Sequence, residues 1–270
     1  MNPDQQAARE AFPTGLDQPE GGYRFSMDPL ILAAFARPKK NTRTVDLGTG
    51  CGVAALTFLL LRAAEARHDG PESEFLVGKH VLDPTEDRIL GLDIDPAMIR
   101  AAKSNAVRLG LADCFQAETQ DIRQVRDHLP PGSFGMALAN PPYRKPESGL
   151  PCRFEDRTRA RFEADARLKD FLTAASWLLT NRGRLAVVFP TDRLAELICG
   201  CRDAKLTPKR LRLIHPRVDQ PSRLALLEAV KNAGPGLRTE APLVLYEGRG
   251  TAARLNAAAL EFCPFLTKNP

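Results

Sequence analysis

The stretch Asp46-Leu47-Gly48-Thr49-Gly50-Cys51-Gly52 decides the fold that we expect for this chain. Residues 44–47 before the glycines are typical of a short buried strand, and the apolar run 53–61 after them is typical of a helix. Glycines at alternate positions let the backbone turn sharply and let a ligand lie against it. The stretch therefore predicts a strand, a ligand-binding loop and a helix, as in an α/β protein.

The spacing of the glycines indicates what kind of ligand the loop binds. A dinucleotide-binding loop reads Gly-x-Gly-x-x-Gly, whereas this chain has Asp-x-Gly-x-Gly-x-Gly, with the acid at Asp46. A carboxylate ahead of the loop repels a pyrophosphate and favours a cationic ligand. A glycine-rich turn with no ligand is the structural alternative.

A second stretch, Asn140-Pro141-Pro142-Tyr143, follows the apolar residues 134–139, which we expect to form a buried parallel strand. The carboxyl ends of such strands are where open α/β sheets bind ligands. The prolines stiffen the backbone, so the Asn140 side chain and the Pro141 carbonyl have one fixed geometry. Two acceptors and an aromatic ring suit a planar group with an exocyclic NH2, on which Tyr143 stacks. A proline-rich turn is the alternative.

Acidic residues end two further expected strands. Asp93 stands at the carboxyl end of residues 89–94, where a carboxylate can accept from both ribose hydroxyls of a nucleoside. Asp95 reads better as the N-cap of the following helix, with Pro96 at its first position, although either acid could be the ligand. Asp121 follows a weaker strand and is either a ligand or a helix cap.

The glycine loop and Asn-Pro-Pro-Tyr resemble motifs I and IV of the amino-group methyltransferases, which methylate adenine N6, cytosine N4 or a glutamine amide. Together with Tyr23-Arg24-Phe25-Ser26-Met27-Asp28 and the stretches 209–216 and 242–246, they make residues 20–250 resemble the bacterial tRNA1(Val) (adenine-37-N6)-methyltransferase family. The resemblance implies a doubly wound, Rossmann-like α/β fold with a mainly parallel seven-stranded sheet and an antiparallel last strand. It also implies S-adenosyl-L-methionine as cofactor and RNA, specifically tRNA, as substrate.

Motif chemistry and resemblance together predict the site residues. We expect catalysis from Asn140, Pro141, Pro142 and Tyr143. We expect cofactor binding by Asp46, Gly48, Thr49, Gly50, Gly52, Asp93, Ile94, Asp121, Ile122 and Asn140. For RNA binding we expect Tyr23, Phe25, Arg144, Lys145, Arg153 and Arg157. The arginine-rich segment after Tyr143 is a substrate-binding lid or, because acidic residues partly neutralise it, a solvated face.

Composition limits the remaining choices. Lys and Arg number 38 against 33 Asp and Glu, which permits a polyanionic partner. No apolar run approaches the ~18 residues of a membrane helix, and the first residues are not a signal peptide, so we predict a soluble, cytoplasmic protein without a membrane partner. Six scattered cysteines without nearby histidines predict reduced thiols and no metal site. No feature implies an oligomer.

We expect effectively one domain from the 270 residues. Residues 1–42 form a lead-in with a short helix, and residues 43–270 form the methyltransferase domain. A polar surface insertion occupies about residues 67–88. In the lead-in, Asp28 reads as the N-cap of the short helix, with Pro29 at its first position.

Three other functions remain open. A ribosomal RNA or DNA adenine-N6 methyltransferase uses the same core. A protein glutamine N5-methyltransferase also carries Asn-Pro-Pro-Tyr. In such an enzyme a helical substrate domain usually precedes the catalytic domain, and residues 1–42 are short for a domain of that kind. An RNA-binding module derived from the fold would have lost catalysis, and the intact Asp46, glycines and tetrapeptide argue against that loss.

Overall fold

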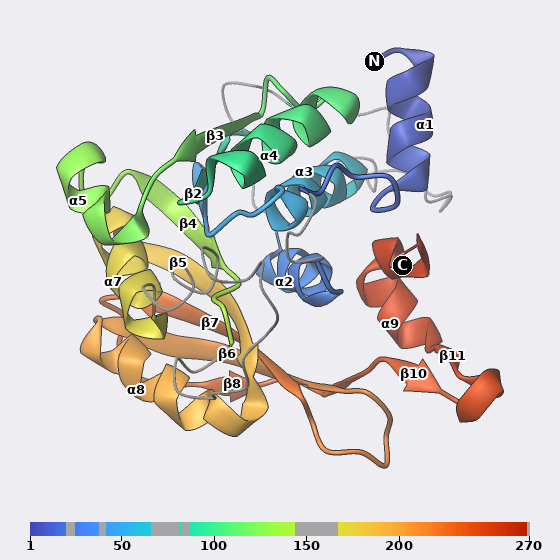
Figure 1. Cartoon of the computed structure of the whole chain (residues 1–270). Coiled ribbons are helices and arrows are strands. Elements are labelled where there is room, and N and C mark those ends of the chain that lie inside the picture. The colour runs from blue at the N-terminus through green and yellow to red at the C-terminus, as the bar shows by residue number, and fades with distance from the viewer. Residues whose placement is uncertain (20–24, 38–41, 66–81, 83–86, 144–166, 269–270) are drawn as a thin grey trace, which may run out of the picture.

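The computed structural model describes residues 1–19, 25–37, 42–65, 82, 87–143 and 167–268 (Figure 1). Its longer strands are β1 (Thr44–Leu47), β2 (Ile89–Asp93), β3 (Phe115–Thr119), β4 (Phe134–Ala139), β5 (Leu179–Pro190), β6 (Leu206–His215) and β7 (Leu224–Lys231). Its two-residue strands are β8 (Arg238–Thr239), β9 (Leu243–Val244), β10 (Tyr246–Glu247) and β11 (Arg254–Leu255).

The helices of the described residues are α1 (Pro3–Ala11), α2 (Asp28–Ala36), α3 (Val53–Glu65), α4 (Pro96–Arg108), α5 (Val125–His128), α7 (Leu168–Leu178), α8 (Leu194–Asp203) and α9 (Ala257–Phe262). Short 3-10 helices are η1 (Ile122–Gln124), η2 (Thr191–Arg193), η3 (Gly250–Ala252) and η4 (Pro264–Lys268). The expected insertion at 67–88 lies almost entirely outside the described residues.

Within the described chain, nine strands form one sheet in the order β3-β2-β1-β4-β5-β7-β6-β8, with β9 also paired to β6. Strands β1 to β5 run parallel to one another, whereas β7 runs antiparallel between β5 and β6. Residues 216–223 join β6 to β7, and this link is too short for the crossover that parallel neighbours need. The expected doubly wound α/β fold with an antiparallel seventh strand is confirmed, and β8 and β9 extend the sheet.

Alternate residues of the central strands enter two hydrophobic clusters, one on each face of the sheet. In β4, Met136 and Leu138 belong to the cluster under α2, α3 and α4, while Ala137 and Ala139 belong to the cluster under α7 and α8. This alternation is the period of two that a strand buried on both faces requires. Figure 1 shows these helices as two layers that cover opposite faces of the sheet.

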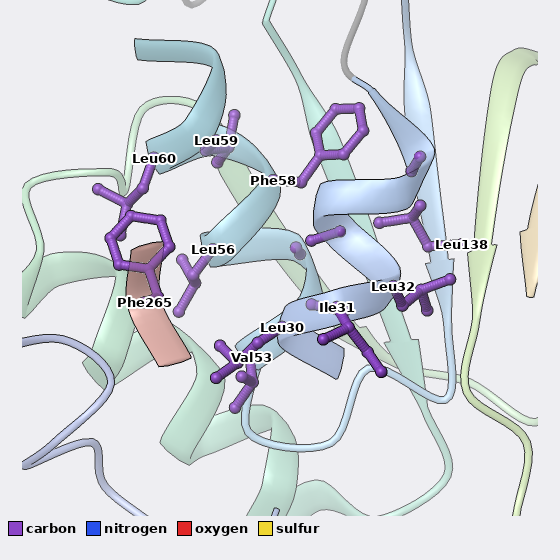
Figure 2. Packing of buried hydrophobic residues seen from close by; sticks show 14 of the residues in the cluster. Leu30, Ile31, Leu32, Val53, Leu56, Phe58, Leu59, Leu60, Leu138 and Phe265 are labelled. Carbon is purple, nitrogen blue, oxygen red and sulfur yellow. The ribbon is translucent and has the colours of Figure 1, made fainter. Parts of the chain in front are cut away.

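The first cluster is built around the contact between α2 and α3. Figure 2 shows Leu30 and Ile31 of α2 and Val53 and Leu56 of α3 within it, and these side chains are at most 3% exposed. Burying each Leu or Ile side chain contributes about 1.5–3 kcal/mol. Because α2 is fixed against the sheet in this way, the residues at its first turn have a defined position at the carboxyl edge of the strands.

A buried ion-pair network joins the antiparallel part of the sheet. Glu228 of β7 is 5% exposed and pairs with Arg184 of β5 and Arg210 of β6, each at 3.0 Å. Arg210 also pairs with Glu240 at 2.8 Å. Breaking one such buried pair leaves an uncompensated charge, which costs about 3–5 kcal/mol. The network therefore ties β5, β6 and β7 to one another.

Helix α1, which the sequence patterns did not predict, packs against the end of α4. The Arg9 guanidinium is buried and donates to the carbonyl oxygens of Leu109 at 2.7 Å and Gly110 at 3.1 Å. These carbonyls follow the last turn of α4, where a cation is favourable. The aromatic pair Phe12 and Phe265, with ring centroids 5.1 Å apart, joins the N-terminal segment to η4.

The side chain of Asn105 links this N-terminal segment to the loop after β1. Its Nδ2 group donates to the carbonyls of Asp17 and Cys51, each at 3.0 Å, and its Oδ1 atom accepts from the Asp17 backbone N–H at 2.7 Å. Asn105 is fully buried, so water cannot replace these bonds.

We therefore expect Asn105→Ala to lower the free energy of unfolding by about 1–3 kcal/mol, because it leaves buried backbone groups without partners. Urea denaturation measures the change. Lys103→Ala is the matched control on the exposed side of α4 and should change stability by less than about 0.5 kcal/mol. Equal losses in the two variants would contradict a structural role for the Asn105 bonds.

Candidate active site

The loops after β1, β2, β4 and β5 meet at the carboxyl edge of the sheet because these strands are parallel neighbours. In register, Leu47 at the end of β1 pairs with Leu92 of β2 and with Ala139 of β4. The glycine loop, Asp93 and Asn-Pro-Pro-Tyr are thus brought together, as the sequence predicted.

The three glycines of the β1 loop serve different purposes. All have positive φ, at 67° for Gly48, 55° for Gly50 and 90° for Gly52. A Cβ on Gly48 would lie 3.0 Å from the Phe171 ring, and one on Gly52 would lie 3.2 Å from Leu56. A Cβ on Gly50 would meet no atom within 4 Å. Packing explains Gly48 and Gly52, while Gly50 faces open space where a ligand can approach the backbone.

Asp46 supports the loop from inside the protein. It is 2% exposed, and its Oδ2 atom accepts a hydrogen bond from the Thr49 hydroxyl at 2.7 Å. Burial raises the pKa of Asp46 to about 7, against the lowering effect of the Thr49 bond. The carboxyl is therefore partly protonated near neutral pH, and a nearby cation would favour its ionised form.

Asp93 connects β2 to the glycine loop. Its Oδ2 atom accepts from the Gly50 N–H at 2.8 Å, and its Oδ1 atom accepts from the Asp95 N–H at 2.9 Å. A carboxylate has about four acceptor sites, so Asp93 keeps acceptor capacity for a ligand hydroxyl. Asp95 accepts from the Ala97 N–H at 2.7 Å and is the N-cap of α4, as expected. Ile94 between them is half-buried.

Asp121 caps the short helix η1. Its Oδ1 atom accepts from the Arg123 N–H at 2.9 Å, capping η1, and its carboxylate pairs with the Arg123 guanidinium at 2.6 Å. These bonds with Arg123 lower the pKa of Asp121. Ile122 is 6% exposed and packs in the second hydrophobic cluster. Cofactor contacts by Asp121 and Ile122 stay predictions.

Tyr143 is the point at which several elements hold the Asn-Pro-Pro-Tyr motif. Its hydroxyl oxygen lies 2.8 Å from Asn140 Oδ1 and 3.0 Å from Asp28 Oδ2. Its ring meets the Phe189 ring edge-on, with centroids 6.0 Å apart. Arg193 donates to the Tyr143 carbonyl at 2.9 Å. Within the motif Pro141 is buried, and Asn140 and Pro142 are half-buried.

The prediction that Asp28 caps α2 with its side chain was wrong. Met27 is the N-cap, without a side-chain hydrogen bond, and Asp28 lies in the first turn. The Asp28 carboxyl instead meets the Tyr143 hydroxyl and is 8% exposed. Its burial raises its pKa, while hydrogen bonds with Tyr143 and Ser26 lower it. The contact with a residue 115 positions away prevailed over the local capping preference.

Sequence reasoning missed three residues that support the motif, namely Asp28, Phe189 and Arg193. The Arg193 guanidinium lies 4.7 Å from the Phe189 ring centroid and pairs with Glu196 at 2.8 Å, so it is itself held in place. The signal available for Phe189 and Arg193 was their place at and after the end of β5, next to β4 in a parallel sheet.

Most predicted RNA-binding residues, Tyr23, Arg144, Lys145, Arg153 and Arg157, lie outside the described residues. Phe25 is half-buried and packs against the first hydrophobic cluster, and its N–H donates to Gln18 Oε1 at 3.3 Å. In the described part of the chain, no group of three or more His, Cys, Asp or Glu side chains could hold a metal ion.

Residues 75–214 match the UPF0020 family, described as RMKL-like, methyltransferase domain. The chain belongs to this family. The methyltransferase is 32% identical over 163 residues to the tRNA1(Val) (adenine(37)-N6)-methyltransferase of Mannheimia succiniciproducens, with 60% of this chain and 57% of that protein covered. It is 28% identical over 202 residues to the protein of the same name from Porphyromonas gingivalis, with 73% of this chain and 70% of that protein covered.

A solved structure agrees with the fold. The predicted O-methyltransferase Atu636 from Agrobacterium tumefaciens matches with a TM-score of 0.63 and 20% identity, covering 88% of this chain and 96% of that one. At this identity the likeness concerns the fold alone.

The cofactor of the methyltransferase is S-adenosyl-L-methionine, and the residues of the β1 loop fit it. Gly50 leaves space beside the backbone, Asp93 keeps acceptors for hydroxyl groups, and Asp46 and Asp93 suit a cationic ligand. When bound, the cofactor supplies a methyl group on a positively charged sulfur. The chain would contribute the acceptors and the shape that hold it.

The pKa of Asp46 predicts how cofactor affinity depends on pH. Its folded pKa of about 7 lies above the ordinary 3.8, so the carboxyl is protonated below neutral pH and must lose that proton to face a cation. Affinity for S-adenosyl-L-methionine should therefore weaken as the pH falls below about 7, by up to about tenfold per pH unit. Isothermal titration calorimetry measures this dependence.

Asp46→Asn serves as the control for that titration, because its amide does not titrate. Other groups, including Asp93 and the amino group of the cofactor, contribute equally to both proteins. The slope of log affinity against pH should be smaller in Asp46→Asn than in the wild type. Identical slopes would show that Asp46 does not cause the pH dependence of cofactor affinity.

Proposed function

We propose that the protein transfers the methyl group of S-adenosyl-L-methionine to the N6 amine of an adenine in tRNA, namely adenine 37 of tRNA1(Val). The names of the relatives from Mannheimia and Porphyromonas support this substrate. The observation that carries the proposal is the position of Asn140 and Tyr143, which are in contact at the end of β4 beside the β1 loop.

The proposed chemistry follows from the weakness of an exocyclic amine as a nucleophile, because its lone pair is delocalised into the ring. Asn140 Oδ1 and the Pro141 carbonyl accept the two amine hydrogens and favour a pyramidal nitrogen whose lone pair points out of the ring plane. Tyr143 stacks on the base and fixes that plane. No general base is needed before transfer, and alignment supplies much of the rate. The adenine has to leave its stack to reach the site.

We propose that further residues bind the RNA substrate. We propose that Arg144, Lys145, Arg153 and Arg157 contact RNA phosphates, as guanidinium and ammonium groups do. Tyr23 and Phe25 are proposed to contact the RNA near the adenine.

The described residues include no helix of the length and apolarity that crossing a membrane requires. We propose that one domain acts in the cytoplasm, where tRNA is found.

Substitution of Asn140 tests the site. Asn140→Ala should lower the transfer rate by on the order of 10²-fold or more, because an aligned hydrogen-bond partner of the reacting group is lost. Affinity for S-adenosyl-L-methionine should survive. Asn181→Ala is the matched control, since Asn181 is exposed at the opposite end of β5. Loss of both transfer and cofactor binding in Asn140→Ala would mean that the assignment of roles is wrong.

The substrate is tested by offering the enzyme and methyl-labelled cofactor four acceptors in parallel: total tRNA, ribosomal RNA, duplex DNA and cell protein. N6-methyladenosine, identified by mass, should appear in tRNA alone. Label in ribosomal RNA, DNA or protein would contradict the proposed tRNA substrate, while the proposed cofactor site would stand. Absence of label from every acceptor would favour an RNA-binding module instead.

A further inference from the structure

Three polar side chains form a chain of short contacts behind the Asn-Pro-Pro-Tyr motif. The Tyr143 oxygen lies 3.0 Å from Asp28 Oδ2 and 2.8 Å from Asn140 Oδ1. A phenol has one hydrogen, and both of these neighbours are acceptors when Asp28 is ionised. Tyr143 therefore cannot donate fully to both, and the protonation of Asp28 decides the direction of donation along the chain.

The two directions place the Asn140 amide differently. If Asp28 is protonated, it donates to Tyr143, and Tyr143 donates to Asn140 Oδ1. If Asp28 is ionised, its carboxylate takes the Tyr143 hydrogen, because a charged acceptor forms the stronger hydrogen bond. The oxygens of Tyr143 and Asn140 then have no hydrogen between them and repel. The amide turns its Nδ2–H group to Tyr143 and its Oδ1 atom away.

We infer that Asp28 is a positioning residue for methyl transfer, whose carboxylate takes the Tyr143 hydrogen and so turns Asn140 Oδ1 toward the amine of the substrate. The inference rests on the proposed function, in which Asn140 Oδ1 accepts from that amine. Asp28 does not touch the reacting atoms and acts through Tyr143 alone.

Burial and hydrogen bonds determine the protonation state of Asp28. Burial raises its pKa above 3.8, and the bonds with Tyr143 and Ser26 act in the opposite direction. Helix α2 packs against α3, β4, β5 and β7. Among the charged side chains described on these elements, Arg62 pairs with Asp87, Arg184 pairs with Glu228, and Lys231 donates to the Leu179 carbonyl. Arg182 of β5 is exposed. From β6, Arg210 lies over the Phe35 ring of α2 and pairs with Glu228.

An NMR titration of the protein with bound cofactor tests the inference without turnover. The side-chain amide signal of Asn140, identified by its loss in Asn140→Ala, is followed from about pH 4.5 to about pH 8, above the ordinary aspartate pKa. It should titrate in the wild type and lose that titration in Asp28→Asn. Titrations that arise from Asp46 or Asp93 are common to both proteins. The same curve in both would overturn the inference.

A double-mutant cycle tests the consequence for transfer, using whichever of the four acceptors takes label. At saturating cofactor, Asp28→Asn should lower the single-turnover rate by about tenfold to a hundredfold, with cofactor affinity within about twofold of the wild type. In a Tyr143→Phe background, Asp28→Asn should have no further effect, because the hydroxyl that connects the residues is gone. If the rate reductions of Asp28→Asn and Tyr143→Phe multiply in the double variant, the two residues act independently and the inference is overturned.

Asp203→Asn, an exposed acid at the end of α8, is the matched control and should leave the rate unchanged. A loss of cofactor affinity in Asp28→Asn would make Asp28 a cofactor ligand and overturn the positioning role. Label in DNA or protein would contradict the proposed RNA substrate while the cycle still decides the role of Asp28. If no acceptor takes label, the proposed function fails and the NMR titration alone decides the inference.

Discussion

Parallel pairing of β1 with β4 is the constraint on which the site depends. Their register sets Leu47 beside Ala139, so the glycine loop and the Asn-Pro-Pro-Tyr motif leave the sheet at adjacent points of one edge. The order of strands continues from β1 to β2 and β3 on one side and from β4 to β5 on the other. A ligand bound at the first loop would lie beside the second loop, at the switch point of a doubly wound sheet.

Tyr143 shows how a short motif obtains its rigidity from the rest of the protein. Two prolines limit the backbone, but the orientation of the Asn140 amide depends on what its neighbours donate and accept. Asp28 reaches the motif from α2, and Phe189 and Arg193 reach it from the end of β5 and from η2. Because α2 is fixed by its apolar contact with α3, the hydrophobic core positions the polar groups of the site.

Burial disfavours the ionised form of three aspartates at this edge of the sheet. Asp46, Asp93 and Asp28 each have a pKa above the ordinary aspartate value because they are withdrawn from water. Their hydrogen bonds with Thr49, Gly50 and Tyr143 offset part of that cost. A cationic cofactor would favour the ionised forms of Asp46 and Asp93, so the same burial that weakens these acids in the free protein prepares them for a positive ligand.

The sequence by itself determined the α/β class, the loop after β1, the capping role of Asp95 and the motif after β4, because each depends on spacing within a few residues. It predicted neither α1 nor the bond between Asp28 and Tyr143, and it left Asp121 open between ligand and cap. Tertiary structure decided the first two points and made Asp121 the cap of η1, while its contact with the cofactor stays a prediction. The packing of α2 on the sheet turned Asp28 from a cap into a partner of Tyr143, and no local pattern encodes a contact between elements that meet only in the folded chain.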